Sequence, residues 1–162
     1  MWVGASLYDG ISPQATGASD MRFLAEPGIV ELDETAQDRV LKQRSIAFAR
    51  TNSTRVIELA WVKFLRFWSP WPNAETLKSP IAFVFSALVT CPLFALATFG
   101  LWDRRRDIRT IILLAGPLFY FLMLHLVFVS SIRYRIPGFI PVLGLAAIGW
   151  QHVLSRIPAK KS

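Results

Sequence analysis

Two arginines flank a tyrosine in the segment Arg133-Tyr134-Arg135, which stands directly before Ile136-Pro137 and between two long apolar runs. A guanidinium group beside hydrocarbon is costly unless it meets an anion, water or the membrane interface. Two guanidinium groups this close together suit a phosphate, because their planar forks of N–H donors match phosphate oxygens. Alternatively, both side chains extend to lipid headgroups and only anchor a helix. The segment alone leaves both interpretations open.

A second basic pair, Lys63 and Arg66, falls within a helix that we predict over residues 54–68. Residues three apart share one face of a helix. Apolar and aromatic side chains cover much of the rest of this helix, and tryptophans gather at its C-terminal end. Such a composition is typical of an amphipathic helix in the headgroup zone of a membrane. Headgroup contact and anion binding are again both open.

The second half of the chain predicts an all-α membrane protein, and the mean hydropathy of the whole chain is +0.40. Its first apolar run has 22 residues without a charge. As a helix this run is about 33 Å long at ~1.5 Å per residue, enough for the ~30 Å of bilayer hydrocarbon. We predict three transmembrane helices, at about residues 80–101, 110–129 and 138–154.

Residues 1–79 form the other predicted region, an extracytoplasmic segment that ends in interfacial amphipathic helices. Residues 1–31 are rich in Gly, Pro, Asp and Ser, and we expect them to form an irregular loop. A helix should follow over residues 33–50, because Asp33 can cap it and apolar residues recur at helical spacing.

Charge is distributed unevenly between the two regions. Residues 1–79 carry nine Lys+Arg and nine Asp+Glu, whereas residues 80–162 carry nine and two, which accounts for the whole net charge of +7. A basic surplus limited to the loops of an apolar region indicates membrane topology and not nucleic-acid binding.

The positive-inside rule then gives an orientation in the inner, cytoplasmic membrane of the cell. The segment 104–109 holds four arginines and the C-terminal tail three basic residues, so we expect both to be cytoplasmic. Two spans separate residues 1–79 from Arg133–Arg135, so both lie on the same side of the membrane. With the other segments in the cytoplasm, this is the extracytoplasmic side. On one side, Lys63, Arg66, Arg133 and Arg135 can line a single anion pocket.

Other chemistries find little support in the sequence. Cys91 is the single cysteine, and His125 and His152 lie in apolar runs without further ligands at metal-binding spacing. Phosphate-cradling glycine loops and nucleophile elbows are absent from the sequence. We therefore expect no metal, no other cofactor and no nucleic-acid partner for this chain.

Three segments appear in a characteristic order: Leu7-Tyr8-Asp9-Gly10 with Ala15-Thr16-Gly17, then Lys63-Phe64-Leu65-Arg66-Phe67-Trp68-Ser69, then Arg133-Tyr134-Arg135-Ile136-Pro137. This order resembles the C-terminal part of bacterial membrane glycosyltransferases of the GT-C type. The group includes the protein O-mannosyltransferases and the lipid A aminoarabinose transferases, and is glycosyltransferase family 39-like. The resemblance covers nearly the whole chain.

The resemblance implies an enzyme that transfers a sugar from a polyprenyl-phosphate donor to an acceptor on the extracytoplasmic face. It implies that the donor phosphate lies near Arg133, Tyr134, Arg135, Lys63 and Arg66. It also implies that the loop with Tyr8, Asp9, Gly10, Thr16 and Gly17 borders the active site. The sugar and the acceptor are not indicated.

The chain departs from the family pattern in one major respect. Members of the family carry their catalytic acidic residues in an outer loop after the first span, and nothing here corresponds to that loop. We therefore expect this chain to be the C-terminal portion of such an enzyme, to contain no catalytic residue and to be inactive alone. Any divalent metal would belong to the full-length enzyme. The rival hypothesis is a non-catalytic membrane protein whose basic residues only anchor headgroups.

Overall fold

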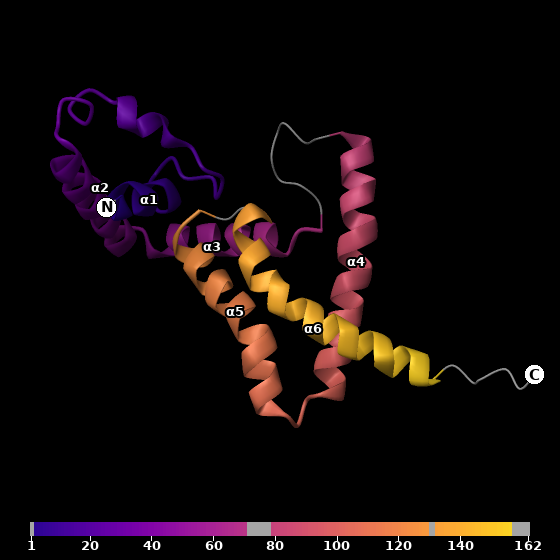
Figure 1. Cartoon of the computed structure of the whole chain (residues 1–162). Helices are drawn as coiled ribbons and strands as arrows, with labels where there is room; N and C mark the ends of the chain where they lie inside the picture. Colours follow the sequence, from indigo (N-terminus) through magenta and orange to yellow (C-terminus); the bar gives the residue numbers. More distant parts are fainter. Residues whose placement is uncertain (1, 71–78, 130–131, 157–162) are drawn as a thin grey trace, which may run out of the picture. The chain divides into compact units, whose positions relative to one another are not determined.

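A computed structural model describes residues 2–70, 79–129 and 132–156, and only the backbone of residues 132–134. Within these residues the chain is all-helical, without strands (Figure 1). The predicted fold class is therefore confirmed. The helices are α1 Val3–Gly10, the 3-10 helix η1 Met21–Ala25, α2 Glu34–Thr51, α3 Ser53–Trp68, α4 Pro80–Asp103, α5 Ile108–Val127 and α6 Ile132–Arg156.

Three of these helices, α4, α5 and α6, are long and apolar enough to cross a membrane. They coincide with the three predicted spans, with ends that differ by a few residues. This is the architecture of a membrane protein.

The last helix corrects one prediction. The predicted third span starts at about residue 138, after Arg133–Arg135, but α6 begins at Ile132 and includes these residues in its first turns. Pro137 and Pro141 both lie inside α6. Proline disfavours helix at the preceding residue, but packing overrides this preference here. A Cβ on Gly138 would lie 2.9 Å from the Cα of Leu118, so the two backbones are in close contact.

The chain forms two compact units. The first comprises Met1–Trp68 and Leu122–Ser131, and the second comprises Ser69–Phe121 and Ile132–Ser162. The end of α5 thus groups with the N-terminal half of the chain. The sequence-based boundary between the extracytoplasmic and membrane regions, between residues 79 and 80, stays a prediction.

A small core joins α1, η1 and α2 in the first unit. Its buried members are Ala5, Tyr8, Phe23, Ile29 and Leu41. The prediction that residues 1–31 form an irregular loop is therefore wrong at two places, Val3–Gly10 and Met21–Ala25, which form α1 and η1. Glycines and turn residues disfavour helix locally, but apolar burial against α2 outweighs that preference.

Gly4 allows the close approach of α1 to α2. A Cβ at Gly4 would collide with the backbone carbonyl of Asp38, and the Gly4 N–H donates to the Asp38 carboxylate at 2.6 Å. The predicted cap of α2 is confirmed, since Asp33 accepts from the N–H of Thr35 at 3.3 Å.

Helix α3 presents two opposed stripes. Leu59, Lys63 and Phe67, spaced four residues apart, are buried. Ile57, Trp61 and Leu65 also recur every four residues, but they are 70%, 60% and 54% exposed. One stripe therefore anchors α3 in the first unit, and the other is an apolar surface, as the predicted interfacial helix requires.

In the second unit, α4 and α6 cross (Figure 1), and two glycines lie where their backbones come closest. A Cβ on Gly100 would collide with the carbonyl of Leu145, and a Cβ on Gly149 with the carbonyl of Leu96. Small residues let helix backbones approach closely where lipid tails remove the hydrophobic drive for association.

Candidate functional site

Lys63 is the most deeply buried charged residue of the described part of the chain, with 1% of its surface exposed. Its ammonium group donates to the carbonyls of Leu126 at 3.2 Å and Val127 at 2.8 Å. These carbonyls belong to the last turn of α5, where helix carbonyls have no partner within the helix. The negative end of the helix dipole also stabilises a cation at this position. Lys63 therefore connects α3 to the C-terminal end of α5 through hydrogen bonds.

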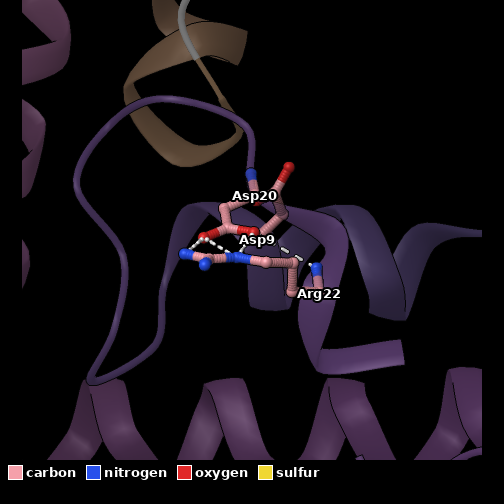
Figure 2. A network of polar contacts seen from close by, with 3 residues as sticks. All are labelled: Asp9, Asp20 and Arg22. Atoms are coloured by element: carbon pink, nitrogen blue, oxygen red, sulfur yellow. Dashed lines mark hydrogen bonds and ion pairs between the residues drawn. The ribbon is translucent and has the colours of Figure 1, made fainter. Parts of the chain in front are cut away.

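Asp9, at the end of α1, is the buried carboxylate of the same unit, with 7% of its surface exposed. It accepts from the Ser19 hydroxyl and from the Asp20 N–H, each at 2.7 Å. Arg22 pairs with Asp20, and Arg22 Nε lies 2.8 Å from the Asp20 carboxylate (Figure 2). Asp9 thus closes the loop between residues 10 and 20, while Arg22 lowers the pKa of the exposed Asp20.

Lys63 and Asp9 influence each other electrostatically. Burial lowers the pKa of Lys63 to about 8, and the Asp9 carboxylate acts in the opposite direction by raising it. Desolvation disfavours a charged amine, whereas a nearby negative charge favours it. At neutral pH most of the Lys63 population is therefore protonated, and the unit holds two buried charges of opposite sign.

Two glycines bring the loop of residues 10–20 close to α3 and to the end of α5. A Cβ on Gly10 would lie 2.5 Å from the Val127 carbonyl oxygen. Gly17 has φ +83°, and a Cβ there would lie 3.2 Å from Val62 Cγ1 and 3.5 Å from Lys63 Cγ and Arg66 Cδ. The left-handed backbone suits glycine, and the lack of a side chain permits this close packing.

The remaining predicted loop residues have other surroundings. Tyr8 is buried in the core, where its ring meets Phe23 edge-on with the ring centroids 4.9 Å apart. Thr16 is exposed to solvent. Asp9, Gly10 and Gly17 are therefore the loop residues that lie nearest to Lys63 and the end of α5.

Arg135 is buried in the second unit, with 5% of its surface exposed. Its Nη1 donates to the Ser69 carbonyl at 2.8 Å. The guanidinium carbon also lies 5.3 Å from the Phe139 ring centroid and 5.7 Å from that of Phe94. A guanidinium over aromatic faces gains cation–π attraction, which is stronger when the group is desolvated.

The structure brings together part of the predicted site. Asp9, Gly10, Gly17, Lys63 and Arg66 belong to the first unit, and Arg135 belongs to the second. The side chains of Arg133 and Tyr134 lie outside the described residues. A single pocket that combines all the predicted cations therefore stays a prediction.

Sequence reasoning missed the carbonyl groups at the end of α5, which bind Lys63. It also grouped Lys63 with Arg66 on one face of the helix. The spacing of Leu59, Lys63 and Phe67 is the signal that was available, because residues four apart lie on the same helix face. It places Lys63 within the apolar stripe that α3 buries.

Searches of protein-family models, of curated proteins and of solved structures find no match to this chain.

Proposed function

We propose that this chain is the donor-binding part of a membrane glycosyltransferase that takes its sugar from a polyprenyl-phosphate carrier. One observation carries the proposal. Residues 9–17 and the Lys63–Arg66 pair, which the family resemblance assigns to one active site, pack against each other in one compact unit. They do so at the end of α5, a helix long and apolar enough to cross a membrane.

In this proposal the basic residues stabilise the phosphate that leaves when the sugar is transferred. Charge stabilisation of a leaving group lowers the barrier without proton transfer, and a water-poor site strengthens it. An ammonium group has three N–H donors. Within the described residues, Lys63 gives two of them to α5 carbonyls, and the proposal assigns the third to a phosphate oxygen. The family resemblance assigns Arg135, with Arg133 and Tyr134, to the same donor phosphate, and the proposal keeps that assignment as an expectation.

The rival function, a non-catalytic membrane protein with headgroup anchors, fits two of these residues poorly. A snorkelling side chain keeps its charged end in the headgroup zone. Lys63 and Arg135 are 1% and 5% exposed, and both donate to carbonyls of the protein. Their burial favours a role inside a polar site over headgroup contact.

The direct test is binding of a polyprenyl phosphate to the purified chain in detergent, measured by native mass spectrometry. We expect the phosphate to bind in preference to the uncharged polyprenol of the same length. Arg135→Ala should weaken the binding by roughly tenfold or more, because a charge-assisted hydrogen bond is worth about 1.5–3 kcal/mol.

Lys42→Ala is the matched control, since Lys42 is an exposed cation of α2. It should leave polyprenyl-phosphate binding unchanged. Equal binding of phosphate and polyprenol, or an unchanged affinity of Arg135→Ala, would contradict the proposal.

The proposal also includes a location and an orientation. The protein lies in the inner membrane of the cell, with residues 1–79 on the extracytoplasmic side and the C-terminus in the cytoplasm. Cysteines introduced at the exposed positions Lys42 and Arg106 test it, after replacement of Cys91 by serine. A thiol reagent that does not cross the membrane should label intact cells at position 42 only. Labelling at position 106 alone would invert the orientation.

A further inference from the structure

A second basic surface lies at the turn between α4 and α5. Arg104, Arg105, Arg106 and Arg109 are all exposed. Helix α4 ends at Asp103 and α5 begins at Ile108, so four residues join them. Four residues reach at most about 14 Å when fully extended. Because the segment leaves the membrane at one end and returns at the other, it can rise above the membrane by only about half of that length. Since both helices are candidate spans, this turn must stay within the headgroup layer, which is ~5–8 Å thick on each side.

The two carboxylates of this segment are already engaged. Asp107 accepts from the Thr110 N–H at 3.2 Å and from the Thr110 hydroxyl at 2.7 Å, which lowers its pKa. Asp103 lies 2.9 Å from His152 Nδ1 and 3.5 Å from Arg104 Nε. Among the described residues, no carboxylate pairs with Arg105, Arg106 or Arg109. The turn therefore presents a surplus of positive charge.

An aromatic residue accompanies these cations. Trp102 is 65% exposed, and the Arg105 guanidinium carbon lies 4.8 Å from its ring centroid. Tryptophan favours the boundary between hydrocarbon and headgroups. Apolar side chains beside the turn are also open to acyl chains: Phe99 is 50%, Ile108 62% and Ile112 63% exposed.

We propose that this basic turn, formed by Trp102, Arg104, Arg105, Arg106 and Arg109, binds the headgroups of anionic phospholipids. The guanidinium forks take the lipid phosphate, and the neighbouring apolar faces of α4 and α5 take its acyl chains. The ligand is a lipid and not free phosphate, because the turn is held at the bilayer surface between two apolar helices. The basic turn belongs to the second unit and uses none of the residues of the Lys63 site, so the inference does not depend on the proposed glycosyltransferase function.

Native mass spectrometry of the full chain in detergent, with added phosphatidylglycerol or phosphatidylcholine, tests this inference. Wild-type protein should retain phosphatidylglycerol in preference to phosphatidylcholine. The triple variant Arg104→Gln, Arg105→Gln, Arg106→Gln should weaken phosphatidylglycerol binding about a hundredfold, since each basic residue at the membrane surface contributes ~1 kcal/mol. The single variant Arg106→Gln should weaken it about fivefold by the same reasoning.

The matched control is Arg39→Gln, Lys42→Gln, Arg50→Gln, which removes the same number of charges from exposed positions of α2. This control should bind phosphatidylglycerol like wild type. The inference would be overturned if the α2 control lost as much phosphatidylglycerol binding as the triple variant of the basic turn, or if that triple variant bound the lipid like wild type. Displacement of the lipid by millimolar inorganic phosphate would also overturn it, because the surface would then be a site for soluble phosphate.

Discussion

The two compact units of this chain are built around different close contacts. In the first unit, buried charges sit between helices: Asp9 closes a loop, and Lys63 binds the carbonyls at the end of α5. In the second unit, the closest contact is backbone on backbone, where Gly100 and Gly149 let α4 and α6 cross. The difference follows from the surroundings. Between apolar spans, glycines give van der Waals contact directly, whereas buried polar groups require partners.

The largest effect should come from Gly149→Ala in the second unit. The added Cβ would meet the backbone carbonyl of Leu96, which cannot rotate away. We expect a loss of about 3 kcal/mol, at the upper end for overpacking. Gly116→Ala is the control, because the nearest atom to its Cβ is 3.8 Å away. Unfolding in detergent, followed by circular dichroism, compares them, and equal stability of the two variants would refute the proposed glycine crossing.

Lys63→Met tests the charge-based contact of the first unit. The variant leaves the carbonyls of Leu126 and Val127 without their donor and Asp9 without its nearby cation. Removing one partner of a buried polar network is strongly destabilising, and we expect a loss of about 2 kcal/mol at pH 7. The same unfolding measurement reports it. Adding Asp9→Asn should recover part of the loss, and a double variant no better than Lys63→Met would argue against the coupling.

Gly17→Ala compares backbone conformation with packing in the loop over α3. Gly17 and Gly28 have φ +83° and +81°, so alanine is strained at both. A left-handed conformation costs a non-glycine residue about 1–2 kcal/mol. At Gly17 the new Cβ also approaches Val62 and Lys63, while at Gly28 nothing lies within 4 Å. Gly17→Ala should therefore be the more destabilising in thermal unfolding, and the reverse order would contradict the packing of the loop on α3.

The smallest expected effect is a dependence of stability on pH. The pKa of Lys63 falls from 10.5 to about 8 on folding, so between these values the unfolded chain binds more protons. Stability then rises with pH in this window, while below pH 8 the cost of burying the charge is fully present. From pH 8 to pH 9 the gain should be about 1 kcal/mol. Lys63→Met should lack this rise, and an identical rise in the variant would assign it to another group.

The sequence by itself determined the all-helical fold, the three apolar helices and the cap of α2 at Asp33. These features depend on local patterns: continuous apolar runs, helical periodicity and a carboxylate before the first helical turn. It also singled out Lys63, Arg66 and Arg135 as basic residues in apolar surroundings.

Only the tertiary structure decided that Tyr8 belongs to a core, that α6 begins at Ile132 and that Lys63 binds the end of α5. Each of these outcomes depends on residues far apart in the chain. Leu41 stabilises α1, which its own glycines disfavour, and Leu126 and Val127 are 63 and 64 residues from Lys63. Local preference is worth less than about 1 kcal/mol per residue, so burial and long-range hydrogen bonds outweigh it.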